Sequence, residues 1–113
     1  MMKIYHNPRC AKSRQTLALL HEHNVAPEIV LYLVDVPDAL EMKDLLLKLG
    51  MTPLELIRKN EASWKENYKG KNLSDDQVIE AMIAHPKLIE RPIVIKDTHA
   101  ILGRPPENVL KLL

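Results

Sequence analysis

The chain has 113 residues, 46% of them apolar, so it can bury a core as a single domain. The formal net charge of +1 predicts no general attraction to nucleic acid or to membranes. One cysteine cannot form an internal disulfide, which is typical of a reducing compartment. We find no signal-peptide pattern and no run of about 18 uncharged apolar residues. We therefore expect a cytoplasmic protein.

The first elements in chain order form a strand, a helix and a second strand. Residues 3–5 are predicted to form a short strand that ends at the turn signal Asn7-Pro8. Leucines at helical spacing then predict a helix over about 11–23, and a β-branched run predicts a strand over 28–34. A helix between two strands favours parallel pairing of those strands.

The middle of the chain, about 38–85, is predicted to be mostly helical. It contains three start signals in which a capping side chain is followed three residues later by Glu or Gln. These signals are Asp38 with Glu41, Thr52 with Glu55, and Ser74 with Gln77. Gly50 is a stop signal for the first of the three helices.

The last third of the chain predicts a hairpin and a closing helix. Strands are expected over 91–96 and 99–102, joined by a turn at Asp97-Thr98, and a helix begins near Pro105 or Pro106. This element order is that of an α/β, thioredoxin-like (glutaredoxin-like) fold over residues 1–113. It predicts a mixed four-stranded sheet with a helical insertion, about 38–85, between the second and third strands.

Cys10 is a candidate nucleophile because of its place at the expected start of a helix. Free backbone N–H groups and the positive end of the helix dipole favour a thiolate there. Arg9, Lys12 and Arg14 add positive charge nearby. A lone cysteine can instead be a small buried side chain, but the polar, basic flanks favour a reactive thiol.

Ser13 stands three residues after Cys10, where a dithiol oxidoreductase carries its second cysteine. Since the chain has no other thiol, an adduct on Cys10 must be resolved by a thiol from outside. Ser13 can also be an ordinary residue of the first helical turn, and the two interpretations are compatible.

Three of the five arginines lie at element boundaries, where folds of this class assemble sites. They are Arg58, Arg91 and Arg104. A guanidinium suits tetrahedral oxyanions, so convergence of these residues on Cys10 would form an anion site. Each can equally be a solvated or ion-paired surface residue, and spacing alone does not show convergence.

Other chemistries lack a pattern in this sequence. The remaining histidines have no metal-ligand spacing, the four Trp and Tyr residues are too dispersed to stack bases, and three glycines make no nucleotide loop. We therefore expect no metal site, no bound cofactor and no nucleic-acid partner.

The sequence resembles the glutaredoxin-type arsenate reductase family, which is thioredoxin-like and depends on glutathione and glutaredoxin. The resemblance rests on four motifs in the family's order: IYHNPRCAKSRQTL, LIRKN, HPKLIERPIVI and GRPPE. It departs from the plasmid-borne members at Ala11-Lys12, where they have Gly-Thr, and in ending at Leu113 without their C-terminal extension. Both departures leave room for a relative with another substrate.

The resemblance implies a role for each matching residue. Cys10 would form the thiol–arsenate adduct, and His6 would tune its thiolate without transferring a proton itself. The three boundary arginines would cradle the oxyanion. Pro92 would be the cis proline that commonly faces the active cysteine in this fold. Glutathione would then attack the adduct as co-substrate and glutaredoxin would free arsenite, and we expect the protein to be a monomer.

Two alternatives remain open at this stage. One is a thiol-dependent reductase or glutathione-exchange enzyme that uses the same cysteine on another substrate. The other is a regulatory binding module, like relatives that bind RNA polymerase. Those relatives typically have a Cys-x-x-Cys pair and lack the HNP and IRKN motifs found here, so we favour an enzyme.

Overall fold

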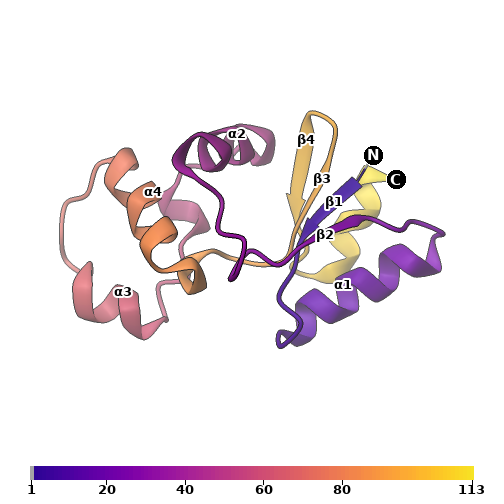
Figure 1. The fold of residues 1–113 in the computed structure, drawn as a ribbon, viewed down its shortest axis with the longest axis horizontal. Coiled ribbons are helices and arrows are strands. Elements are labelled where there is room, and N and C mark those ends of the chain that lie inside the picture. The colour runs from indigo at the N-terminus through magenta and orange to yellow at the C-terminus, as the bar shows by residue number, and fades with distance from the viewer. Residues whose placement is uncertain (1) are drawn as a thin grey trace. The chain divides into compact units, whose positions relative to one another are not determined.

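A mixed four-stranded sheet is the framework of the computed structural model, which describes residues 2–113 (Figure 1). The strand order is β2-β1-β3-β4; β1 pairs parallel with β2, whereas the β1–β3 and β3–β4 pairs are antiparallel. The bounds are β1 (Met2–Tyr5), β2 (Glu28–Val30), β3 (Ile93–Lys96) and β4 (His99–Leu102). The predicted sheet, its parallel pair and its hairpin are confirmed.

One face of the sheet is covered by α1 (Ala11–Glu22) and η3 (Pro106–Leu112), which also pack against each other (Figure 1). Side chains alternate across a strand, so Met2 and Ile4 point to the same face. Together with Val94, which is opposite Ile4, they pack against Leu20 of α1 and Val109 of η3. All five are buried, and this core fixes the carboxyl end of β1 next to the start of α1.

The second strand is shorter than predicted. We expected it over 28–34, but β2 ends at Val30, and the Leu31 carbonyl accepts backbone hydrogen bonds from Val34 (2.9 Å) and Asp35 (2.8 Å). Tyr32 within this turn is buried. Leu31 and Val34 in this part of the run are 41% and 81% exposed, so the apolar and β-branched composition beyond Val30 marks neither a strand nor a buried segment.

Contacts divide the chain into two compact units, and the second, Val36–Glu90, contains the predicted helical insertion at 38–85. The first consists of the residues up to Asp35 together with Arg91–Leu113. That residues 1–113 behave as one domain stays a prediction. The second unit contains α2 (Ala39–Leu49), η1 (Leu54–Leu56), α3 (Ala62–Asn67), α4 (Asp75–Ala84) and η2 (Pro86–Leu88).

The start signals of the second unit act as predicted. The Asp38 side chain accepts the Glu41 N–H at 2.8 Å, and Gly50 ends α2 in the left-handed conformation with φ 67°. Ser74 and Gln77 form a reciprocal capping box at the start of α4. Thr52 and Glu55 are also reciprocally bonded, but they start only the short 3-10 helix η1.

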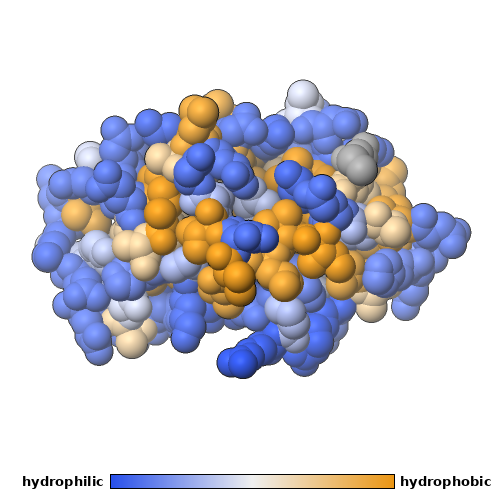
Figure 2. Space-filling model, viewed as in Figure 1, coloured by the Kyte–Doolittle hydropathy of each residue, from blue (hydrophilic) through white to orange (hydrophobic). Residues whose placement is uncertain are grey.

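Some large apolar side chains remain at the surface. Leu40 and Leu47 of α2 are 80% and 81% exposed, and Figure 2 shows apolar side chains gathered at the surface on the face drawn. Within residues 2–113, no helix has the length and apolar character required to cross a membrane.

Candidate functional site

The loop that carries Cys10 is held by its own backbone and by Asn7. The Cys10 N–H donates to the Asn7 carbonyl (3.0 Å), and the Arg9 N–H donates to the Asn7 side-chain oxygen (3.0 Å). Cys10 is the residue that caps α1; its backbone is extended, and its carbonyl accepts the Arg14 N–H at 3.0 Å. The thiol is therefore fixed at the N-terminus of a helix of twelve residues, as the sequence predicted.

His6 and Ser13 form a buried polar pair beneath this loop. His6 Nδ1 lies 2.6 Å from Ser13 Oγ, and the same oxygen accepts the Asn7 N–H at 3.0 Å. Ser13 is completely buried and His6 is 6% exposed. Burial first, and then the positive charge of Arg14, lower the pKa of His6, so its imidazole is neutral at pH 7. The pair ties the loop to the first turn of α1.

The pKa of Cys10 is lowered by groups that outweigh the effect of burial. Burial, the largest single influence, raises the pKa of this half-buried thiol. The backbone N–H groups of Ser13 and Lys12 and the hydrogen-bonded, positively charged Arg91 guanidinium act in the opposite direction and together prevail. A larger thiolate fraction at neutral pH makes Cys10 a better nucleophile.

Arg91 and Arg104 are brought together by the β3–β4 hairpin. Ile93 pairs with Leu102, which places the residues before β3 beside those after β4. Arg104 Nη1 donates to the Arg91 carbonyl at 3.4 Å. The Arg91–Pro92 peptide bond is cis, as the element order suggested, and the Arg104–Pro105 bond, for which no prediction was made, is also cis. Two of the three predicted arginines thus share one end of the sheet, and Arg91 contacts Cys10.

Arg58 belongs to the second unit, where its backbone and its charge both have partners. Its N–H donates to the Leu88 carbonyl at 2.7 Å, next to the bridge between Ile57 and Ile89. Its guanidinium lies 3.8 Å from a Glu61 carboxylate oxygen and 3.9 Å from one of Glu90. The convergence of Arg58 on Cys10 stays a prediction.

Two residues beside the site were missed by the sequence analysis. Thr16 is completely buried on α1, and its hydroxyl donates to the Lys12 carbonyl at 2.8 Å. Gly103 is buried directly before Arg104 and approaches Thr16 closely. The available signal was the rarity of glycine in a chain with only three, one of them adjacent to a candidate arginine.

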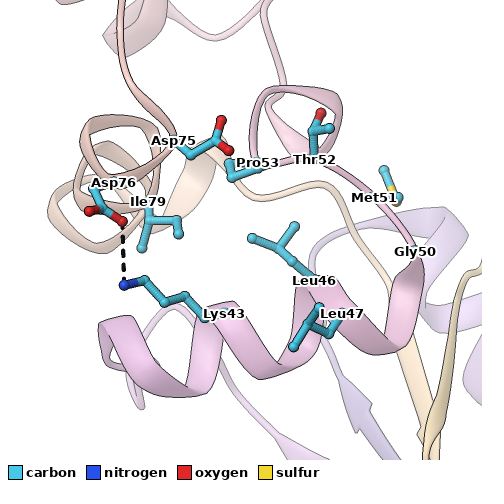
Figure 3. A pocket seen from close by; sticks show the side chains of 10 residues that line it. All are labelled: Lys43, Leu46, Leu47, Gly50, Met51, Thr52, Pro53, Asp75, Asp76 and Ile79. Atoms are coloured by element: carbon cyan, nitrogen blue, oxygen red, sulfur yellow. Dashed lines mark ion pairs between the residues drawn. The ribbon is translucent and has the colours of Figure 1, made fainter.

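A pocket of about 570 Å³ in the second unit has a different character (Figure 3). Its walls include Leu46, Met51 and Ile79, and Lys43 pairs with Asp76 at 3.3 Å across its rim. It contains no nucleophilic thiol and no arginine. Across residues 2–113 we also find no cluster of three His, Cys, Asp or Glu side chains able to hold a metal ion.

Comparison with known proteins identifies one family along nearly the whole chain. A sequence profile described as the ArsC family matches residues 5–112. The uncharacterized protein YfgD of Escherichia coli is 52% identical, over 99% of this chain and 96% of its own length. An arsenate reductase of Neisseria meningitidis is 43% identical, over 99% of this chain and 97% of its own.

Solved structures agree in fold. An arsenate reductase from Vibrio cholerae matches with a TM-score of 0.94 at 47% identity, covering 99% of this chain and 97% of that one. The thioredoxin-like fold and the family resemblance predicted from the sequence are both confirmed. The profile spans nearly the whole chain, and the Neisseria meningitidis and Vibrio cholerae proteins are each covered over 97% of their length, so the chain belongs to the ArsC family.

Proposed function

We propose that this protein reduces arsenate to arsenite through a covalent adduct on Cys10. The observation that carries the proposal is the placement of the thiol: Cys10 caps the start of α1 beside the Arg91 guanidinium. The helix N–H groups and this guanidinium together lower the pKa of Cys10. A cationic group beside a thiolate suits the approach of an anionic substrate, which a bare thiolate would repel. Relatives similar over their whole length are named arsenate reductases.

The first step is attack of the Cys10 thiolate on arsenic. A sulfur–arsenic bond forms, an arsenic–oxygen bond breaks, and the oxygen leaves as water or hydroxide. Arg91 and Arg104, with Arg58 as the proposed third member, hold the remaining oxyanion oxygens by charge-assisted hydrogen bonds. Neutral His6 favours the thiolate by fixing the loop, and it transfers no proton itself.

External thiols complete the reaction, because Cys10 is the only thiol in the chain. Glutathione adds its sulfur to arsenic, and a second oxygen leaves as water. The glutaredoxin thiolate then attacks the glutathione sulfur: a glutathione–glutaredoxin disulfide forms, the glutathione sulfur–arsenic bond breaks, and its electron pair reduces arsenic. Water finally cleaves the Cys10 sulfur–arsenic bond, which releases arsenite and returns the Cys10 thiol. In total, arsenate and two thiols give arsenite, one disulfide and water. No resident cofactor is required. The protein would work as a monomer in the cytoplasm, where glutathione keeps thiols reduced.

The proposal is tested by coupled turnover. Oxidation of NADPH is followed with glutathione reductase, glutathione, glutaredoxin and arsenate, using the wild type and Cys10→Ser. We expect arsenate-dependent turnover in the wild type and none in Cys10→Ser, whose unfolding should match the wild type. Turnover retained in the variant would contradict the adduct mechanism.

If the wild type shows no turnover with arsenate, the reactivity of Cys10 can still be measured independently of the substrate. If Cys10 is still alkylated rapidly at neutral pH, the thiol is reactive but arsenate is not its substrate. That outcome would favour the alternative of a thiol-dependent reductase or glutathione-exchange enzyme. The Ala11-Lys12 pair next to the nucleophile is the sequence feature that supports this alternative.

A further inference from the structure

Gly103 lies where three segments of the site meet. A methyl group built on its Cα would stand 2.8 Å from Thr16 Oγ1 and 3.1 Å from Thr16 Cγ2 on α1. It would also stand 2.9 Å from Cγ of Pro92. Real side chains do not approach to such distances, so any residue other than glycine forces at least one of these neighbours to move.

The backbone around Gly103 connects these segments. The Gly103 N–H donates to the Pro92 carbonyl at 2.9 Å, which extends the β3–β4 ladder one step toward the site. The Thr16 hydroxyl donates to the carbonyl of Lys12 at 2.8 Å. The Lys12 N–H is one of the groups that stabilise the Cys10 thiolate. A displacement at Gly103 therefore reaches both the helix that starts at Cys10 and the segment that carries Arg91.

Gly103 differs from the other glycines in the reason for its identity. Gly50 and Gly70 have positive φ angles of 67° and 81°, and a methyl group added at either would meet nothing within 4 Å. They are glycine because of backbone conformation. Gly103 is glycine because of space, since its surroundings leave no room for a Cβ.

We propose that Gly103 is a positioning residue for the thiol site. Because Gly103 has no Cβ, Thr16 of α1 and Pro92 can both pack directly against its backbone. Cys10 and Arg91 are then held within hydrogen-bonding reach of each other. A side chain at 103 would push α1 away from that segment and separate the thiol from its guanidinium.

The experiment compares Gly103→Ala with Gly70→Ala. The rate of Cys10 alkylation by iodoacetamide is measured across pH, with thermal unfolding and circular dichroism to show that each variant is folded. In Gly103→Ala we expect the pKa of Cys10 to rise by about 1, the lower end of the effect of losing a nearby opposite charge. That rise lowers the thiolate fraction at neutral pH up to about tenfold.

Gly70→Ala is the matched control for a general loss of stability. Its added methyl is strained by the positive φ but touches nothing within 4 Å, so it should lower the melting temperature and leave the alkylation profile unchanged. A folded Gly103→Ala with the wild-type profile would overturn the proposal. An equal change in both glycine variants would overturn it as well, because the effect would then follow stability rather than position.

A second variant covers the case in which Gly103→Ala does not fold. Thr16→Ala removes both Thr16 atoms that the new methyl would strike. The double variant Gly103→Ala/Thr16→Ala should be more stable than Gly103→Ala alone. Its rise in the pKa of Cys10 should be smaller than the sum of the changes in the two single variants. The contact with Pro92 Cγ at 2.9 Å remains in the double variant, so only part of the stability should return. Strict additivity of the two substitutions, in melting temperature or in the pKa of Cys10, would overturn the close-contact explanation.

The inference rests on the proposed function only in taking Cys10 as the reacting thiol. Its assay contains no arsenate. Absence of arsenate turnover in the wild type would contradict the proposed function without affecting this test. An unchanged alkylation profile in Gly103→Ala would contradict the inference without affecting the proposed function.

Discussion

The loop before α1 and the segment around Arg58 are both fixed by backbone hydrogen bonds, but their charges are arranged in opposite ways. At the first, the Cys10 sulfur, whose pKa is lowered in part by Arg91, is itself the group that becomes an anion beside that guanidinium. At the second, Arg58 already faces two carboxylates, Glu61 and Glu90, at 3.8 and 3.9 Å. An arriving oxyanion meets a cation shared with a thiolate in one region, and a cation accompanied by carboxylates in the other.

This comparison shows that an arginine at an element boundary is not by itself an anion site. Whether such an arginine can bind an anion depends on which negatively charged groups the fold places beside it. The arrangement at Arg91 combines the attraction of an oxyanion with activation of the nucleophile, because the same guanidinium serves both. At Arg58, binding of an oxyanion must compete with carboxylates of the same unit.

Among substitutions at these two regions, Arg91→Ala should have the strongest consequence. It removes a charge-assisted bond worth about 1.5–3 kcal/mol, so oxyanion affinity should fall about tenfold to a hundredfold, and the pKa of Cys10 should rise. Calorimetric titration with arsenate and pH-dependent alkylation measure the two effects. Arg91→Lys keeps the charge but loses the planar fork, and it should therefore restore the pKa more fully than the affinity. Normal arsenate binding by Arg91→Ala would contradict the assignment.

Ser13→Ala tests the support beneath the thiol loop. It leaves the half-buried Asn7 N–H and the buried His6 Nδ1 without their shared oxygen partner, and an unpaired buried polar group costs about 1–3 kcal/mol. Urea unfolding should show a loss of stability in this range. Ser63→Ala, at a half-buried serine in the other unit, is the control and should change little. Equal losses in the two variants would show that the His6–Ser13 pair contributes nothing special.

Stability should also fall in mild acid because of His6. Burial and Arg14 lower the pKa of this histidine in the folded chain, so the unfolded chain binds the proton more readily. The contribution of neutral His6 is complete above about pH 6.5, the ordinary histidine value. It is lost as pH falls from there through the lower folded value. Urea unfolding between pH 7 and pH 5 measures the loss.

His6→Asn should reduce this acid sensitivity, since no titrating imidazole remains at the buried position. His21→Asn changes an exposed histidine and should retain the wild-type profile. If His6→Asn keeps the full acid sensitivity, another group is responsible for it.

Much of this arrangement could be predicted from the sequence, since it depends on local rules. Capping side chains gave the helix starts, and the Asn7-Pro8 turn placed Cys10 before a helix. Other features depend on contacts between residues distant in the chain. The space that requires Gly103 is set by Thr16, 87 residues away, and the early end of β2 follows from a turn built around buried Tyr32. No spacing rule within one segment encodes such contacts.

The arginines show the same division. Their boundary positions could be predicted, but the Arg91 contact with Cys10 depends on the pairing of β1 with β3, in which Tyr5 is opposite Ile93. The carboxylates beside Arg58 come from two different segments. A guanidinium at a boundary is visible in the sequence, whereas the charges that surround it are not. The three arginines are therefore equivalent in the sequence, whereas in the structure they differ in the charged groups beside them.

Glu61→Gln should change stability and arsenate affinity least, and it tests directly whether the carboxylates beside Arg58 compete with an oxyanion. The pair with Arg58 is partly exposed and long at 3.8 Å, so stability should change by less than about 1 kcal/mol. If Arg58 does bind the oxyanion, removing a competing carboxylate should raise arsenate affinity slightly in calorimetry, an effect absent from Glu66→Gln on exposed α3 surface. A fall in affinity would mean that Glu61 positions the guanidinium rather than competes for it. The carboxylates beside Arg58 would then hold its guanidinium in position for the oxyanion. Arg58 and Arg91 would in that case differ in how firmly their side chains are held, and not in the negative charge that competes for them.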